Sequence, residues 1–191
     1  MVNEANAVLS YWMNDVGPQG WFHPDAAAEL KSLEFKELWS RAAAGEMGAW
    51  ICAPEACLAL VVLLDQLPRV MFRGRDDAYA SDEVALAVTK RAIVMGHDLK
   101  VSEPERQFFY TPLMHSESLM DQERCVRLMS LRLPQADETM LAHIRAHRDI
   151  IRQFGRFPYR NAILGRKNTE AEAAYMMAGG YTTSVKAAAA A

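Results

Sequence analysis

The chain has 191 residues, of which 51% are hydrophobic and 24% are charged, and its net charge is −3. This length suits one domain with a sizeable core, and the composition is ordinary for a globular protein. Cys52, Cys57 and Cys125 form an odd set without metal-ligand spacing, which argues against a disulfide framework and favours a reducing compartment. The N-terminus lacks the order of a signal peptide, and the apolar run near Leu60 is shorter than the roughly 20 residues that cross a bilayer. We therefore expect a cytoplasmic protein that does not insert into a membrane.

Charge is distributed unevenly along the chain. Residues 1–65 carry nine acids and three bases, whereas residues 145–167 carry six arginines and one lysine against Asp149. Arginine outnumbers lysine fifteen to six, which favours forked, bidentate pairing over diffuse charge. Two interpretations stay open: the acidic first third packs against the basic segment, or some of the arginines bind an anionic ligand. A nucleic-acid-binding protein is normally basic overall, so we do not expect nucleic acid as a partner.

Every extended segment of the chain is typical of a helix, and no alternating run of β-branched residues indicates a strand. The predicted helices are Asn3–Asp15, Asp25–Ala44, Pro54–Pro68, Asp82–Met95, a short helix with Phe108 and Phe109, Ser118–Pro134, Asp137–Phe154 and Thr169–Gly179. Gly17-Pro18 stops the first helix, and the segment from Trp21 through Phe22 and His23 is expected to form a loop. Short helices in succession predict an all-α fold, a single-domain multi-helix array over residues 1–180 with a frayed tail over 181–191.

The segment from Pro54 to Arg75 is the element around which we expect the rest of the chain to be built. From Ala56 to Leu64 it runs nine residues without a polar side chain, which is typical of a helix buried on all sides. Pro54 suits the first helical position, because an N–H group there would have no partner within the helix. Pro68 is expected to end this helix or to bend it sharply.

Polar residues follow directly at the C-terminal end of this buried helix. Asp65 and Gln66 come first, and Arg69 and Arg73 lie four residues apart, so that both can point the same way. Asp65 can orient one of these arginines through a bidentate ion pair. The structural alternative is a buried carboxylate and amide whose partners are all internal.

Two further polar residues fall on apolar helix faces. Gln122 lies on the stripe of Leu119 and Val126, and His147 lies between two isoleucines at helical spacing. Each is either a satisfied core side chain or part of a site, since a buried polar group needs a partner. The presence of several such positions beside arginines favours one shared site.

A histidine and a carboxylate occur together at the helix junction before Leu119. A hydrogen-bonded pair of His115 and Glu117 can act as a general base, or the two residues can simply begin a helix. His143 and His147 are one helical turn apart, as in half of a zinc site, but no glutamate lies between them. We therefore predict no metal ion and no cofactor.

Arginines also gather after the predicted helix that ends at Phe154. Beyond Gly155 the chain is expected to leave the helix, and Pro158 and Gly165 favour turns that present side chains inward. The polar residues on these turns are Arg156, Arg160, Asn161 and Arg166.

Three ordered motifs carry a resemblance to a known family. LLDQLPRVMFRG, PLMHSESLMDQ and HRDIIRQFGRFPYRNAILGR, the last followed by T-x-x-E, resemble the domain of unknown function 924 family over about Val8 to Met177. Members of that family are all-helical and are placed with tetratricopeptide-like (TPR-like) folds, so the resemblance implies a TPR-like core but no activity. Tyr159 is a departure, because the family more often has histidine there. The family's characteristic polar positions fall here on Asp65, Gln66, Arg69, Arg73, His115, Glu117, Gln122, His147, Arg156, Arg160, Asn161 and Arg166.

These observations support three hypotheses for the function. The first is a TPR-like binding module with an arginine-rich polar pocket for a small anionic ligand or an acidic peptide. The alternative is a hydrolase or lyase that acts on an anionic substrate, with His115 or His147 as the base and Glu117 as its orienting partner. The third is purely structural, a buried salt-bridge network that holds the helices together. In the first hypothesis the ligand-binding residues are Asp65, Gln66, Arg69, Arg73, Gln122, Arg156, Arg160, Asn161 and Arg166.

Overall fold

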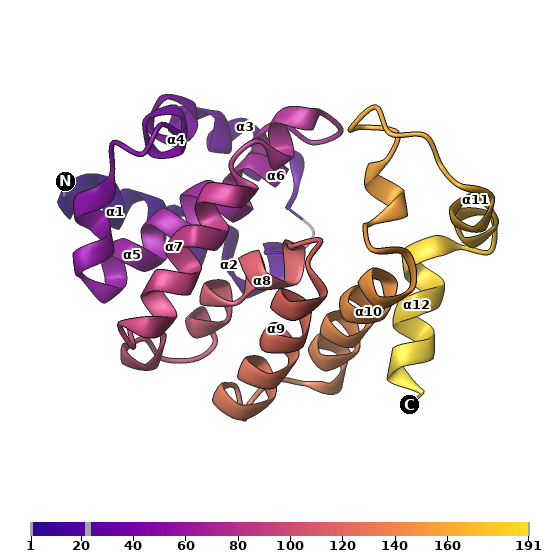
Figure 1. Cartoon of the computed structure of the whole chain (residues 1–191). Coiled ribbons are helices and arrows are strands. Elements are labelled where there is room, and N and C mark those ends of the chain that lie inside the picture. The colour runs from indigo at the N-terminus through magenta and orange to yellow at the C-terminus, as the bar shows by residue number, and fades with distance from the viewer. Residues whose placement is uncertain (1, 22–23, 191) are drawn as a thin grey trace. The chain divides into compact units, whose positions relative to one another are not determined.

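The computed structural model describes residues 2–21 and 24–190, and every regular element in these ranges is helical (Figure 1). The all-α prediction is confirmed. Phe22 and His23, part of the expected loop, lie outside the described residues. Internal contacts divide the chain into two compact units, Met1–Pro112 and Leu113–Ala191, and each is described by itself. The single domain over residues 1–180 stays a prediction.

Most helices belong to the first unit. Its α-helices are α1 (Val2–Leu9), α2 (Gly17–Gly20), α3 (Ala26–Ser32), α4 (Lys36–Ala43), α5 (Pro54–Val61), α6 (Leu67–Met71) and α7 (Asp82–Val94). The π-helices Ser10–Val16 and Val62–Gln66 join α1 to α2 and α5 to α6. The 3-10 helices are Leu33–Phe35, Gly48–Cys52, Asp76–Tyr79, Asp98–Lys100 and Glu105–Phe109. None of the helices in the described ranges combines the length and apolar character needed to cross a lipid bilayer.

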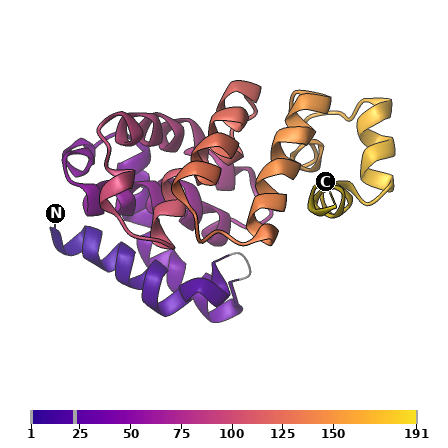
Figure 2. The ribbon, with the colours of Figure 1, turned by 90° about the horizontal axis from the view of Figure 1, so that it is seen from below.

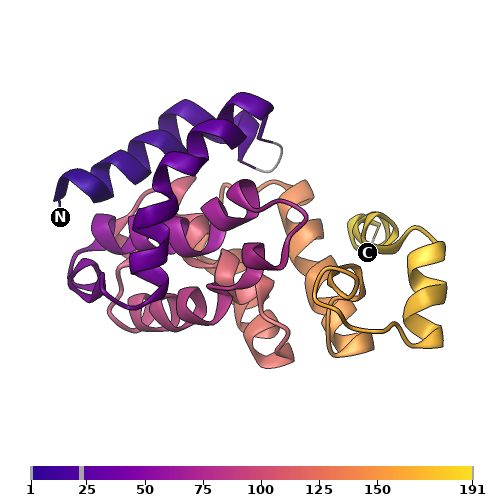
Figure 3. The same cartoon turned by 90° about the horizontal axis from the view of Figure 1, so that it is seen from above.

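The chain begins with a helical run from Val2 to Gly20, seen along its length in Figures 2 and 3. The run starts as α1, continues as the π-helix Ser10–Val16 and breaks at Gly17, whose φ of 61° and ψ of 177° are not helical. A positive φ suits glycine, which has no Cβ, and Pro18 then occupies the first turn of α2. The predicted stop at Gly17-Pro18 is therefore confirmed as a break, after which one more short helix follows.

The apolar segment before Asp65 is the centre of the first unit. Residues Cys57 to Leu64 are each at most 3% exposed, and α5 packs against both α1 and α7. Trp12 and Phe108 are fully buried in the same unit and meet edge to face, with ring centroids 5.9 Å apart. The predicted buried helix is confirmed. A helix that is apolar on every side removes most apolar area from water when neighbours cover it all round.

The sequence predicted that Pro68 either ends the helix or bends it sharply. In the structure the helical run does not end at Pro68. The N–H of Leu67 donates to the carbonyl of Val62, which lies five residues earlier in the chain, whereas an α-helical bond spans four residues. Helix α6 then continues past Pro68. The wide π turn places Pro68 in the first turn of α6, where proline is tolerated because an N–H group there has no partner within the new helix. The helical path therefore passes through Asp65 and Gln66 rather than stopping at them.

The second unit is built on α10 (Glu138–Phe154), which has α9 (Leu119–Arg132) and α12 (Gly180–Ala189) beside it (Figure 1). The N-cap Asp137 accepts a hydrogen bond from the N–H of Met140, and Gly155 ends the helix in the left-handed conformation. Ile144 and Ile151 are buried on the inner face of α10. The remaining elements are α8 (Thr111–His115), which spans the boundary of the units, the 3-10 helix Pro158–Arg160, and α11 (Glu170–Met177).

The segment expected to be a frayed tail is helix α12 in this structure. Its residue Ala188 is 7% exposed and packs with Ala142 and Ala146 of α10, and Tyr181 and Val185 cover the same cluster. Alanine has the highest helix propensity, and small side chains let two helices approach closely. A tail of alanines therefore forms a helix because α10 offers a matching small-residue face.

Replacing Leu63 with alanine should destabilise the first unit strongly. Leu63 is 0% exposed, so its truncation leaves a cavity, and we expect a loss of about 2–5 kcal/mol in the free energy of unfolding, measured by urea denaturation. Leu30→Ala on α3 is the matched control, because Leu30 is 72% exposed, and it should change stability by less than about 0.5 kcal/mol. Equal losses in the two variants would contradict the central position of the apolar helix.

Candidate functional site

The candidate residues divide between the two units. Those in the first unit are Asp65, Gln66, Arg69 and Arg73. Those in the second unit are His115, Glu117, Gln122, His147, Arg156, Arg160, Asn161 and Arg166.

Asp65 and Gln66 end the π-helix Val62–Gln66 and are both buried. The amide nitrogen of Gln66 donates to Oδ2 of Asp65 at 2.6 Å and to Oγ1 of Thr111 at 3.1 Å. The Thr111 hydroxyl donates in turn to the carbonyl of Phe108 at 3.0 Å. These polar groups satisfy one another inside the first unit, as buried polar groups must.

Arg69 joins this cluster to α7. Its Nη1 donates to the Asp65 carbonyl at 2.6 Å and lies 3.5 Å from the Asp65 carboxylate, while Nη2 is 2.9 and 3.0 Å from the two carboxylate oxygens of Asp82. Burial lowers the pKa of Arg69, but the charges of Asp65 and Asp82 outweigh it and the pKa is raised. Arg69 is therefore held in an internal ion pair.

Arg73 has a different partner from Arg69. Helix α6 ends at Met71, and Arg73 lies on the following turn, where its Nη2 pairs with Glu29 of α3 at 2.8 Å. The Arg73 side chain is 55% exposed. A spacing of four residues brings side chains together only where one helix contains both residues, and here the helix ends between them.

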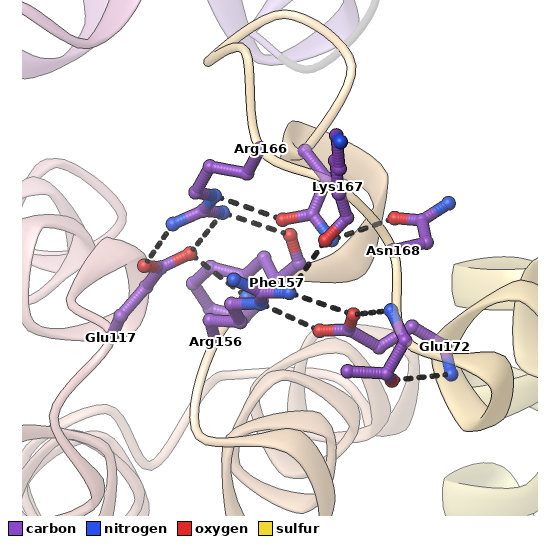
Figure 4. A network of polar contacts seen from close by, with 9 residues as sticks. Glu117, Arg156, Phe157, Arg166, Lys167, Asn168 and Glu172 are labelled. Atoms are coloured by element: carbon purple, nitrogen blue, oxygen red, sulfur yellow. Dashed lines mark hydrogen bonds and ion pairs between the residues drawn. The ribbon is translucent and has the colours of Figure 1, made fainter.

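In the second unit, an ion pair between Glu117 and Arg166 joins segments that are 49 residues apart (Figure 4). Nη1 of Arg166 donates to Oε2 of Glu117 at 2.7 Å and Nη2 donates to Oε1 at 2.9 Å, the forked geometry typical of arginine with a carboxylate. Oε1 also accepts the N–H of Phe157 at 2.8 Å. Burial raises the pKa of Glu117, but the bonds from Arg166 and Phe157 and the charges of Arg166 and Arg160 together lower it. This carboxylate is therefore charged at neutral pH, with both oxygens bound by internal donors.

Asn161 holds the third nitrogen of the Arg166 guanidinium. Nε of Arg166 donates to Oδ1 of Asn161 at 2.8 Å, and the Asn161 amide nitrogen donates to Oδ1 of Asn168 at 2.7 Å. Nη2 of Arg166 also donates to the Phe157 carbonyl at 3.2 Å. All three guanidinium nitrogens of Arg166 thus have partners within the second unit.

Arg156 forms a second forked pair, with Glu172 of α11 (Figure 4). Its Nε donates to Oε1 of Glu172 at 2.6 Å and its Nη2 donates to Oε2 at 2.8 Å and to the Lys167 carbonyl at 2.9 Å. Thr169 and Glu172, the T and E of the T-x-x-E motif, form a capping box, in which Oε2 of Glu172 accepts the N–H of Thr169 at 2.7 Å. The bonds from Arg156 and from the N–H of Thr169 lower the pKa of Glu172 to about 2.

Gln122 fixes the backbone on both sides of His115. Gln122 is 0% exposed, and its amide nitrogen donates to the carbonyls of Met114 at 2.6 Å and Ser116 at 2.7 Å. The Ser116 hydroxyl donates to Oδ2 of Asp121 at 2.9 Å. Gln122 and Asp121, both at the start of α9, therefore set the position of His115 through its neighbours.

His147 and Arg160 both contact the ring of Phe157, and His115 lies beside His147; we call these four residues the histidine–arginine cluster. The imidazole centroid of His147 lies 6.3 Å from that of His115 and 5.4 Å from the ring of Phe157. The guanidinium of Arg160 lies over the face of Phe157, 4.5 Å from the centroid, where the ring quadrupole attracts a cation. Arg160 is 6% exposed and His147 is 8% exposed. One phenyl ring thus packs against both a buried cation and a buried imidazole.

His147 is neutral at physiological pH. Burial is the largest cause, and the charges of His115 and Arg160 add to it, so that the pKa of His147 is lowered to about 3 despite its bond to the His143 carbonyl. Nδ1 lies 2.8 Å from that carbonyl oxygen and 3.3 Å from the hydroxyl of Tyr181. An imidazole with this pKa is uncharged at neutral pH and is a weak base.

Sequence reasoning missed three participants. Glu172 is visible in the sequence as a capping residue, but its pairing with Arg156 has no local signal. Phe157 and Tyr181 have the composition of core aromatics, and only their contacts with His147 place them in the site. In the part of the chain that the structure describes, no group of three or more His, Cys, Asp or Glu side chains is arranged to hold a metal ion.

Two comparisons place the chain among known proteins. A family model described as "Bacterial protein of unknown function (DUF924)" matches residues 8–180. The solved structure of a protein of unknown function from Agrobacterium tumefaciens has 39% sequence identity and a TM-score of 0.85, with 92% of this chain and 97% of that chain covered. No curated protein matches the chain. The fold is thus shared with a solved relative, and neither match names an activity.

Replacing Arg166 with alanine should destabilise the second unit, because the charged, half-buried carboxylate of Glu117 then loses both hydrogen bonds from the guanidinium. We expect the free energy of unfolding to fall by about 1–3 kcal/mol in chemical denaturation. Arg127→Ala, at an exposed position of α9, is the control and should change it by less than about 0.5 kcal/mol. The double variant Glu117→Ala/Arg166→Ala should lose less than the sum of the single losses, and strict additivity would contradict the pairing.

The Arg156–Glu172 pair should give a stability contribution that depends on pH. The pKa of Glu172 is lower in the folded protein than in the unfolded chain, so the contribution is present in full above the unfolded pKa and is lost as the pH falls toward about 2. Glu172→Gln should therefore lower Tm at neutral pH, and its difference from wild type should narrow as the pH is lowered from about 6 to about 3. If the difference in Tm between wild type and Glu172→Gln stays constant from about pH 6 to about pH 3, the charge of Glu172 is not the source of the lost stability.

Proposed function

Since this chain belongs to the DUF924 family of bacterial proteins of unknown function, we propose its function from its own side chains. The protein is a binding module for a small anionic ligand, held in the second unit by the histidine–arginine cluster. Arg160 supplies the charge, and His115 and His147 lie beside it. Gln122, Glu117, Asn161 and Arg166 form the polar framework that holds these groups in place.

One observation carries the proposal: the buried Arg160 guanidinium is stacked on Phe157, whose ring also contacts the neutral His147. The pKa of His147 is lowered by burial first and then by the charges of His115 and Arg160, so a second cation is disfavoured at this imidazole. The charge of Arg160 in a largely desolvated position favours an anion, because Coulomb interactions are stronger away from water.

The contacts of the other candidate arginines favour structural roles over ligand binding. Arg156 and Arg166 are each bound in a forked pair, by Glu172 and Glu117 respectively. Arg69 is bound through Nη2 by the carboxylate of Asp82 and through Nη1 by Asp65. These pairs favour the structural hypothesis for those residues, since their donors already face carboxylates. The exposed Arg73 pairs with Glu29 on the surface, where ion pairs contribute little.

The burial of the cluster favours a small ligand over an acidic peptide. Arg160 and His147 are 6% and 8% exposed, so a compact oxyanion or carboxylate reaches them more easily than a polypeptide backbone does.

A hydrolase or lyase with His115 or His147 as the base stays the second candidate, because the two imidazoles lie close together. Two observations count against the proposed catalytic roles. The pKa of about 3 makes His147 a weak base, and Arg166 occupies both oxygens of Glu117, the expected orienting partner.

A TPR-like core and a cytoplasmic location belong to the same proposal. Antiparallel packing of successive short helices, as in α9 and α10, is the basic unit of such repeats. Cys57 and Cys125 are buried free thiols, and burial raises the pKa of each, which fits a protein that keeps its cysteines reduced.

Replacing Arg160 with glutamine should weaken anion binding without preventing folding. Calorimetric titration of wild type with phosphate, sulfate and dicarboxylates should find at least one that binds, and Arg160→Gln should weaken that Kd by about tenfold or more, because a charge-assisted bond is lost.

Arg127→Gln is the matched control for this titration, since it removes the same charge from an exposed position of the same unit. Circular dichroism should show that both variants are folded. Binding of no anion by the wild type, or equal weakening in the two variants, would exclude Arg160 as the anion-binding group.

A further inference from the structure

Exposed apolar side chains gather at the C-terminal end of α7. Val94, the last residue of the helix, is 81% exposed, and Met95 is 40% exposed. Leu99, on the 3-10 helix that follows, is 55% exposed. Single exposed hydrophobic residues are ordinary on a protein surface, but three within so short a stretch form a patch of the kind that binds a partner. Arg91 and Lys100 flank these three residues in the sequence, and we call the five residues the α7 patch.

The cations of the α7 patch have no ion-pair partners. Both Arg91 and Lys100 are exposed, and in the part of the chain that the structure describes neither meets a carboxylate. Asp98 belongs to the same turn, but it is buried, and its Oδ2 accepts a hydrogen bond from the Tyr110 hydroxyl at 2.6 Å. The α7 patch is therefore an apolar surface with two positive charges at its edge.

A second exposed apolar surface lies where α3 leads through the 3-10 helix Leu33–Phe35 into α4. Leu30 is 72% exposed and Leu33 is 45% exposed. Glu34 and Glu37 are also exposed, and neither forms an ion pair among residues 2–21 and 24–190. This surface combines exposed leucines with two carboxylates that have no ion-pair partner. We call Leu30, Leu33, Glu34 and Glu37 the α3–α4 surface.

Two lysines on the same segment leave the sign of this surface negative. Lys31 is bound to Asp15, with Nζ 2.6 Å from Oδ2. Lys36 is exposed and forms no ion pair within the described ranges, so a single lysine stands against two glutamates. The α7 patch and the α3–α4 surface therefore carry opposite charges, each beside exposed apolar side chains. Complementary potentials of this kind orient two protein surfaces and disfavour wrong partners.

The two surfaces belong to one compact unit and lie at opposite ends of it (Figure 1). Helices α3 and α4 are at one end, and α7 runs toward the other, where its C-terminal residues lie. One copy of the first unit therefore cannot bring its own two surfaces into contact, whereas a second copy can place its α3–α4 surface on the α7 patch. A contact between two different surfaces is heterologous, and it continues from copy to copy unless a ring closes.

We propose that the protein associates with a second copy of itself, with the α7 patch of one copy against the α3–α4 surface of the next. The glutamates of one copy meet the cations of the other, and the apolar side chains of the two surfaces remove one another from water. This inference goes beyond the proposed function, because it concerns the first unit, whereas the anion site lies in the second. Both surfaces are small, so the association is weak and the chain is monomeric in dilute solution. Leu30→Ala therefore remains a control for folding when urea denaturation is measured in dilute solution.

Sedimentation velocity of the full chain over a wide range of protein concentration tests the association. The weight-average sedimentation coefficient should rise with concentration, and the rise should weaken as salt is added, because exposed ion pairs are screened. A coefficient that corresponds to a single chain at every concentration would overturn the proposal.

Charge reversal tests which surfaces meet. Arg91→Glu/Lys100→Glu makes the edge of the α7 patch negative, and Glu34→Lys/Glu37→Lys makes the α3–α4 surface positive. Each double variant alone should associate at least about tenfold more weakly than wild type, because like charges then face each other. An equal mixture of the two should recover the wild-type association, since each reversed surface finds the opposite charge on the other variant and the unreversed surfaces still match. A mixture that associates as weakly as its components would overturn the pairing.

Lys167→Glu/Lys186→Glu is the matched control, since it reverses two charges at exposed positions of the second unit and changes the net charge as the reversal of the α7 patch does. This variant should associate like wild type, and circular dichroism should show that every variant is folded. Val94→Ser tests the apolar contact at a side chain that is 81% exposed and so contributes little to folding, and it should weaken the association about tenfold. Undiminished association of Val94→Ser, or an equal loss in the lysine control, would overturn the proposal.

Discussion

The forked ion pair between Glu117 and Arg166 is the constraint on which the polar arrangement of the second unit depends. It joins the start of α9 to the turns that follow α10, and Oε1 of Glu117 accepts the N–H of Phe157 at the same point. Removing two charges from water is costly, so such a pair contributes more to a single arrangement of the chain than to net stability. Here every nitrogen of the guanidinium is bound, and Phe157 is thereby held where its ring meets Arg160 and His147.

Three arginines within eleven residues of the sequence have different environments for a physical reason. Arg156 and Arg166 face carboxylates that lie on other helices or turns, and their charges are largely compensated. Arg160 is on the 3-10 helix Pro158–Arg160, which turns its guanidinium onto the face of Phe157. The charge of Arg160 acts both on the imidazole of His147 and on the carboxylate of Glu117, and it lowers the pKa of each.

In the first unit, buried polar groups lie at the C-terminal end of the most apolar helical segment. The π turn Val62–Gln66 carries the helical path past Pro68, and it leaves Asp65 and Gln66 buried beside Thr111. Arg69 then caps this cluster from the next helix. These groups pair with one another, which explains why a buried carboxylate and amide are tolerated in the core.

The sequence by itself determined the all-α fold, the buried helix after Pro54, the ends of α10 and the capping box of α11, because periodicity, caps and glycine act over one or two turns. The same periodicity predicted inward positions for Gln122 and His147, and both are buried, although Leu119 on the stripe of Gln122 is 40% exposed. Tertiary structure alone decided which carboxylate each arginine meets, since Arg156 and Glu172 are 16 residues apart and Glu117 and Arg166 are 49 apart. It also decided the docking of α12 and the neutral state of His147. These depend on burial and on charges from distant segments, and no local pattern of residues encodes such contacts.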